Sequence, residues 1–185
     1  MSEAADQLRQ NVKVVDYDPR WRELFSAERD TLLASVHSFI ELEHIGSTAV
    51  PGQRAKPIID IMTAVHSLDE LEAFLPQLQA HGYHLIDADM PRRHFLRRQD
   101  PSGQIYHLHI VEHTAWDDRK ERLMRDYLLK YPEAVQAYGD LKSELAKTYA
   151  EDSVAYTEAK TDFIQNLMDK ARAELGLPPI DVWEE

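Results

Sequence analysis

The sequence predicts an α+β fold, in which a mixed β-sheet is followed by packed C-terminal helices. Two observations predict it. Strand-like and helix-like segments are mixed rather than strictly alternating over about residues 12–113, whereas the apolar spacing is helical over about 116–176. Because short links join the C-terminal helices, we expect them to pack against one another and against the sheet. The 185 residues are therefore expected to form a single domain, 1–185.

In the first half of the chain, capping and turn residues separate the apolar runs. Asp18 and Pro19 have the residue types of a helix N-cap and first helical position. Ser67 and Glu70 have the spacing of a capping box, and His81-Gly82 ends the helix that the box opens. The elements expected here are a strand over 12–15, a helix from 18, strands over 40–45 and 57–65, and a helix over 67–82.

The second half begins with strands and ends with helices. A turn at 100–103 is a hairpin-type connection between two strands. Pro132 restarts a helix, Asp152 or Ser153 caps another, and Gly176 ends it. The elements expected here are strands over 83–86, 95–98 and 104–111 and three helices, from 116, from 132 and from 152 or 153.

The charge and residue composition limit the kinds of partner that the protein is expected to bind. The chain has 33 acidic and 21 basic residues, a net charge of −12, and a field of this sign opposes nonspecific binding to nucleic acids or anionic membranes. No apolar run approaches the ~20 residues of a membrane span. With no cysteine, disulfides and thiolate metal sites are excluded. We therefore expect a cytoplasmic protein without a nucleic-acid or membrane partner, although a local basic pocket for a small phosphate ligand is compatible with the charge.

One carboxylate stands in an otherwise apolar strand. Asp60 lies between Ile59 and Ile61, where a charge is costly unless a partner, hydrogen bonds or a metal offsets it. Gly46-Ser47, before the turn that leads to this strand, can let backbone N–H groups approach a phosphate. Lys56 could meet a phosphate or pair with Asp60. The segment predicts a site for an anionic ligand, and the alternative is a buried structural carboxylate held by Lys56 or an arginine.

These residues also carry a resemblance. GSTAVPG followed by AKPIIDI resembles the signature of the GrpB family, which is itself similar to the nucleotidyltransferase superfamily. Further similar segments are 14–21, 107–111, 125–128, 141–142, and Tyr156 with Lys160. The resemblance implies a mixed sheet of the nucleotidyltransferase type. Because GrpB-like domains occur fused to dephospho-CoA kinase, it also implies a non-catalytic accessory role with a protein partner as the alternative function.

The resemblance implies a site for two metal ions, but one residue at the expected position is not a suitable metal ligand. Active nucleotidyltransferases place two carboxylates two residues apart on one strand face, pointing at paired metal ions. Here Met62 stands where the second carboxylate belongs, and a thioether is a poor ligand for hard Mg²⁺. Met62 therefore argues against two-metal nucleotidyl transfer, while the resemblance keeps a nucleotidyltransferase-like transferase as a possible activity.

A pair of histidines suggests a different metal site. His107 and His109 share one face of the 104–111 strand, so both could reach one ion or one anionic ligand. With Asp60 they resemble a 2-His-1-carboxylate site for one divalent metal (Mg²⁺, Mn²⁺ or Zn²⁺), and His44 could join them. The same residues are the candidate acid–base groups. The alternative is a half-buried strand face whose imidazoles are satisfied, because H-x-H is a short signal.

The leading hypothesis is a pocket that binds a nucleotide or another phosphorylated small molecule. Arg97, which follows Phe95 in an apolar strand, is added as an anion ligand. A simple metal-binding or phosphate-sensing protein is a third possibility. Tyr156 and Lys160 have the spacing of a reductase-like pair but lack a dinucleotide fingerprint, and no P-loop motif is present. The predicted pocket comprises Gly46, Ser47, Lys56, Asp60, Arg97, His107 and His109.

Overall fold

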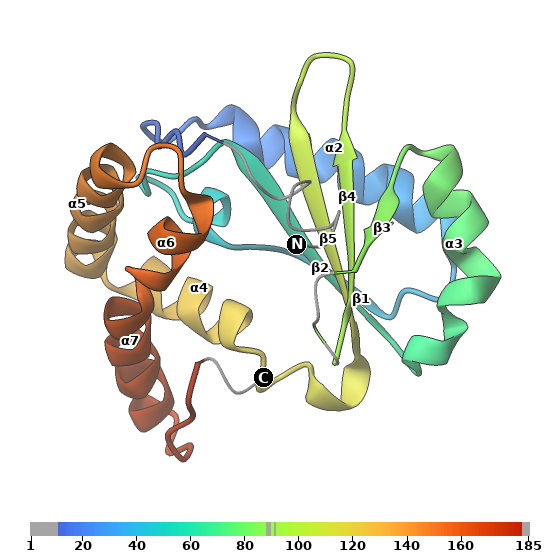
Figure 1. Ribbon diagram of the computed structural model, residues 1–185. Coiled ribbons are helices and arrows are strands. Elements are labelled where there is room, and N and C mark those ends of the chain that lie inside the picture. Colours follow the sequence, from blue (N-terminus) through green and yellow to red (C-terminus); the bar gives the residue numbers. More distant parts are fainter. Residues whose placement is uncertain (1–10, 88–89, 91, 183–185) are drawn as a thin grey trace.

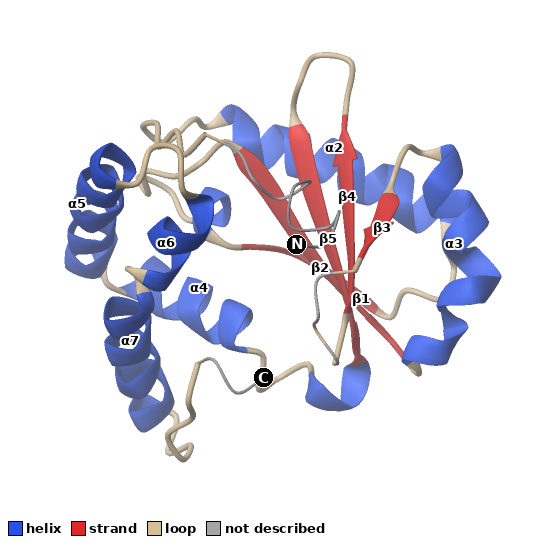
Figure 2. Cartoon of the chain, in the orientation of Figure 1, coloured by secondary structure: helices blue, strands red, loops and turns tan. Residues whose placement is uncertain are grey.

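A five-stranded mixed sheet forms the centre of the molecule (Figures 1 and 2). The computed structural model describes residues 11–87, 90 and 92–182. The strand order is β1-β2-β5-β4-β3; β2 and β5 are parallel and the other neighbours are antiparallel. This arrangement confirms the predicted α+β class. The strands are β1 (Glu41–Ile45), β2 (Ile58–Val65), β3 (His84–Ile86), β4 (His94–Gln99) and β5 (Ile105–Glu112).

Helices cover both faces of the sheet, with α2 and α3 on one side and the C-terminal helices on the other (Figure 1). In the described residues, no helix has the length and apolar character needed to cross a membrane. The α-helices are α2 (Arg20–Ser35), α3 (Leu71–Ala80), α4 (Lys120–Lys130), α5 (Pro132–Thr148), α6 (Ser153–Glu158) and α7 (Thr161–Glu174). Short 3₁₀ helices are η1 (Ser47–Ala49), η2 (Leu68–Glu70) and η3 (His113–Ala115).

The central strand β2 separates the two layers. Ile59 and Ile61 are fully buried in the core that α2 and α3 build on one face. Asp60 and Met62 point to the opposite face, toward the C-terminal helices, because side chains alternate along a strand. Coverage of both faces explains why β2 is almost continuously apolar. Asp60 therefore lies between the sheet and the helical layer.

Two predicted elements differ from the observed ones. The strand expected over 12–15 is only an isolated bridge between Val15 and Ala55, because the Val12 N–H bonds to the Ala150 carbonyl instead of to a strand. The helix expected from 152 to 176 is split into α6 and α7. At the break, the Lys160 N–H bonds three residues back to the Thr157 carbonyl, which tightens the last turn. Neither glycine nor proline marks this break.

Candidate functional site: a cavity lined by lysines

Asp60 is held in the sheet by its strand neighbours. Its register partners are Ile45 on β1 and His107 on β5, so all three side chains share the face toward the C-terminal helices. The His107 Nδ1–H donates to Asp60 Oδ1 at 3.1 Å. Burial by itself raises the pKa of Asp60, but this hydrogen bond and the nearby histidines lower it below its usual value overall. Asp60 is therefore an ionised carboxylate at neutral pH.

The Gly46-Ser47 turn packs directly against this carboxylate. Gly46 has φ 70° and ψ −170°, a conformation that is essentially restricted to glycine. A Cβ at this position would lie 2.7 Å from Asp60 Oδ2. Both the backbone conformation and the close approach therefore require glycine. The immediate reason for Gly46 is its contact with Asp60, and the turn places Ser47 at the edge of the same site.

Thr48 fastens the turn to β2. Its hydroxyl donates to the Ile58 carbonyl at 2.9 Å and accepts from His44 Nε2 at 2.9 Å. The His44 ring also stacks on Phe25, with 4.6 Å between ring centroids. Burial lowers the pKa of His44 to about 4, so the ring is neutral at pH 7. His44 thus supports the turn and does not line the cavity described next.

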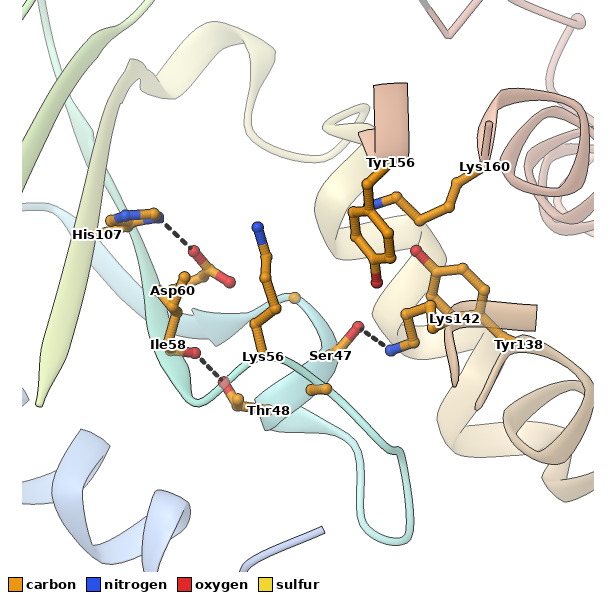
Figure 3. A pocket seen from close by; sticks show the side chains of 12 residues that line it. Ser47, Thr48, Lys56, Ile58, Asp60, His107, Tyr138, Lys142, Tyr156 and Lys160 are labelled. Carbon is orange, nitrogen blue, oxygen red and sulfur yellow. Dashed lines mark hydrogen bonds and ion pairs between the residues drawn. The ribbon is translucent and has the colours of Figure 1, made fainter. Parts of the chain in front are cut away.

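A cavity of about 250 Å³ lies between Asp60 and the C-terminal helices (Figure 3). It contains five of the seven predicted pocket residues and brings them next to residues from α5, α6 and the start of α7. Asp60 is the one carboxylate among the described residues that line it. The lining residues are Gly46, Ser47, Thr48, Ala55, Lys56, Ile58, Asp60, His107, Tyr138, Lys142, Tyr156 and Lys160.

Three lysine side chains converge on this cavity from separate parts of the chain (Figure 3). Lys56 precedes β2, Lys142 lies on α5, and Lys160 stands at the α6–α7 junction. The Lys142 Nζ donates to Ser47 Oγ at 2.8 Å and lies 4.3 Å from the Tyr138 ring centroid. The Tyr156 ring lies 4.3 Å from the Lys160 Nζ and 5.6 Å from the Lys56 Nζ. These distances are within the range of cation–π attraction.

The surroundings of these lysines disfavour their charged forms. Burial, reinforced by the nearby Lys160 and Arg54, lowers the pKa of Lys142 to about 6. Burial and the neighbouring Lys56 lower the pKa of Lys160 to about 8, and burial also lowers that of Lys56. In the described part of the chain, none of the three ammonium groups has a carboxylate oxygen within 4 Å. An anion in the cavity would supply the missing counter-charge.

The sequence interpretation missed the helical wall of the cavity, formed by Tyr138, Lys142, Tyr156 and Lys160. A signal was present, because Leu141-Lys142 and Tyr156 with Lys160 belong to the segments that resemble the GrpB family. The spacing of Tyr156 and Lys160 did indicate proximity. In the structure both side chains line the cavity.

The three predicted metal ligands, Asp60, His107 and His109, do not form a metal-binding group in the structure. Among the described residues, no group of three or more His, Asp or Glu side chains is placed to hold a metal ion. His109 does not line the cavity, because it stands opposite Met62 and packs against the Phe95 ring at 4.9 Å. Burial, together with the charge of Arg93, lowers the pKa of His109 to about 4. His109 is therefore a packed, neutral imidazole beside an ion pair between Arg93 and Glu121.

The residue at the position of the second carboxylate, Met62, lies in apolar surroundings. Met62 is fully buried in a cluster of apolar side chains that includes Ile45 and Trp116. Glu43, the partner of Met62 on β1, accepts hydrogen bonds from Arg122 at 3.0 Å and from Arg125 at 2.6 Å. Glu43, a candidate for a replacement carboxylate, is thus already neutralised. These residues do not fit a two-ion site.

Arg97 lies near the cavity without lining it. It stands opposite His107 on β4, so it shares the face of Asp60. Its Nε is buried and has no hydrogen-bond partner among the described residues, and the same holds for His107 Nε2. A role for Arg97 as an anion ligand stays a prediction.

Comparison with solved structures defines the class of fold. The structure of terminal uridylyl transferase 4 from Trypanosoma brucei with bound CTP aligns with a TM-score of 0.53 and 16% identity, covering 98% of this chain and 60% of that one. At this identity the match shows the shared fold alone. The protein thus has a nucleotidyltransferase-type α+β fold, as the resemblance implied.

Closer matches identify the family. The family described as "GrpB protein" matches residues 11–170, and the chain belongs to the GrpB family. The crystal structure of conserved protein GrpB from Enterococcus faecalis aligns with a TM-score of 0.80 and 28% identity, covering 89% of this chain and 99% of that one. A UPF0157 protein of Streptomyces coelicolor is 34% identical over 158 residues, which is 85% of this chain and 83% of that protein.

Some relatives are much longer than this chain. UPF0157 protein YqkA of Bacillus subtilis is 29% identical over 167 residues, covering 89% of this chain but 48% of that protein. Dephospho-CoA kinase of Mycolicibacterium paratuberculosis is 26% identical over 186 residues, covering 86% of this chain and 46% of the kinase. The chain therefore spans about half the length of these two relatives.

Proposed function

We propose that the protein binds a nucleotide or another phosphorylated small molecule in the lysine-lined cavity. The observation that carries this proposal is the convergence of Lys56, Lys142 and Lys160 without a carboxylate ion-pair partner among the described residues. Burial without a counter-charge disfavours the ammonium form of each lysine, and a bound phosphate would favour that form again through charge-assisted hydrogen bonds. The match to a uridylyl transferase with bound CTP supports a nucleotide as one candidate ligand.

The remaining lining residues supply the other contacts that such a ligand needs. Ser47, already bonded to Lys142, offers a hydroxyl to a phosphate oxygen. Tyr138 and Tyr156 offer phenol groups and ring faces at the helical wall. The cavity, at about 250 Å³, is slightly smaller than the ~300–1,000 Å³ of a typical ligand site. It therefore suits a small ligand, or the phosphate end of a larger one.

Asp60 and His107 form a hydrogen-bonded polar pair at the floor of the cavity. Asp60 accepts the Nδ1 proton of His107, and this hydrogen bond fixes the orientation of the ring. An imidazole oriented by a carboxylate is a common arrangement for a general base. Because His107 Nε2 is buried, we assign this pair to the polar floor of the cavity rather than to proton transfer with a ligand.

A non-catalytic accessory domain is the second candidate function. It is favoured by Met62, which removes the second carboxylate of a nucleotidyl-transfer site, and by the match to part of a dephospho-CoA kinase. Ligand binding separates the two candidates, because an accessory domain needs no phosphate in the cavity.

A thermal-shift titration tests the proposal. ATP, CTP, UTP, CoA and inorganic tripolyphosphate would be titrated with and without a divalent metal. A ligand at a hundredfold excess over its dissociation constant stabilises the folded state by about 2.7 kcal/mol. We expect a shift with at least one ligand, reduced in Lys142→Met and retained in Lys147→Met, which changes an exposed lysine on the same helix. No shift with any ligand would refute the proposal and favour the accessory function.

A further inference from the structure

We infer that the cavity takes its phosphorylated ligand as the metal-free anion, with lysine ammonium groups supplying the counter-charge that divalent ions supply in two-metal sites. The inference rests on the proposed function and specifies the form of its ligand. It is drawn from the residues that surround Asp60.

The carboxylate at the cavity floor has little capacity left for a metal ion. Asp60 Oδ1 accepts the Nδ1 proton of His107 at 3.1 Å. On the side of Oδ2, the Gly46 main chain lies so close that even one added carbon would come within 2.7 Å of this oxygen. Hard divalent cations take six or more oxygen ligands, mostly carboxylates, carbonyls and waters. One carboxylate in this position does not form such a shell.

The positions from which further ligands would come are already engaged. Met62, two residues along the same face, is packed in an apolar cluster, and Glu43 beside it is bonded to two arginines. His109 is packed against Phe95 and lies 3.4 Å from an Arg93 nitrogen. A divalent ion near Asp60 would therefore face the lysines with only one carboxylate to offset their repulsion.

The lysines, in contrast, are placed as an anion site requires. Lys142 is only 3% exposed, and its ammonium group is held between Ser47 Oγ and the Tyr138 ring. Lys160 and Lys56 share the Tyr156 ring, which lies across the cavity from Asp60 (Figure 3). Aromatic faces hold cations in place without neutralising their charge. The three lysine amino groups are thus oriented by neutral groups and keep their capacity to pair with a phosphate, Lys142 by taking up a proton when the anion binds.

Isothermal titration of ATP and of inorganic tripolyphosphate, in EDTA and again in excess Mg²⁺, tests this inference. In EDTA we expect binding at least as tight as in Mg²⁺, because the metal neutralises phosphate charge that the lysines would otherwise meet. Lys142→Met and Lys160→Met should each weaken binding in EDTA tenfold or more. Lys147→Met, the matched control on α5, should leave the dissociation constant unchanged, and circular dichroism would confirm that each variant is folded.

Three results would overturn the inference. Binding that appears only with Mg²⁺ or Mn²⁺ would show that a metal carries the counter-charge, and would leave the proposed function standing. Equal affinity of the parent, Lys142→Met and Lys160→Met in EDTA would show that the lysines are not the counter-ions. Absence of binding in both conditions would refute the proposed function and this inference together.

Discussion

Gly46 offers the sharpest test of how the site is built. Replacing it by alanine adds one carbon 2.7 Å from Asp60 Oδ2, at a residue with φ 70° and ψ −170°. The backbone conformation alone costs a non-glycine residue about 1–3 kcal/mol. Displacing the carboxylate would also weaken its bond to His107, at a cost of about 1.5–3 kcal/mol for a charged hydrogen bond. We therefore expect Gly46→Ala to lower the free energy of unfolding by about 2.5–6 kcal/mol.

Gly52 provides the matched control. Its φ is 80°, but a Cβ there would meet nothing within 4 Å. Gly52→Ala should thus lose only the backbone term, about 1–2 kcal/mol. Urea denaturation of the two variants measures the difference. Placing Gly46→Ala in an Asp60→Ala background should reduce its cost, because the oxygen at 2.7 Å and the Cγ at 3.3 Å are then absent. If Gly46→Ala costs no more than Gly52→Ala in the parent, the contact with Asp60 does not determine the turn.

Three further predictions concern charge. The pKa of Asp60 is lowered in the folded state, so its ionised form stabilises the fold above the unfolded pKa of about 3.9. The stability difference between the parent and Asp60→Asn should therefore shrink as the pH falls below about 4, and a constant difference in urea denaturation down to pH 2.5 would contradict this. For Lys142, the folded pKa of about 6 lies far below its unfolded value, so the unfolded chain binds the extra proton between the two values. Lys142→Met should unfold at a higher urea concentration than the parent at pH 7, and this stability difference should shrink toward pH 10. A stability difference that grows with pH would contradict the prediction. Finally, a phosphate near Lys142 favours the charged form of this lysine, so ATP should bind with proton uptake at pH 7 and more weakly at pH 8.5 than at pH 6.5. Calorimetry in two buffers of different ionisation enthalpy measures the number of protons exchanged. Proton release on binding would refute this prediction.

Local patterns predicted much of the sheet and the floor of the site. Ser67 and Glu70 form the expected capping box, although it opens the short helix η2 just before α3. Alternation along each strand grouped Asp60 with Met62 and His107 with His109, and the observed register makes Asp60 and His107 neighbours. These features follow from residues close in sequence or from the fixed alternation of strands.

The helical wall could not be derived in the same way. Lys142 reaches Ser47 across 95 positions of the chain, a pairing that helical periodicity on α5 does not encode. Periodicity would also continue one helix through Lys160, whereas the break there separates α6 from α7. His109 shows the limit of parity: it lies on the expected face, but it stands opposite Met62 and is buried between Phe95 and Arg93, outside the cavity. Tertiary packing, rather than local pattern, determines these contacts.

The affinity of ATP in EDTA for a Lys142→Met/Lys160→Met double variant, compared with the parent, tests the central claim most directly. If the convergent lysines create the anion site, the parent binds in the absence of metal and the folded double variant has lost at least a hundredfold in affinity. An undiminished affinity in the double variant would contradict the claim.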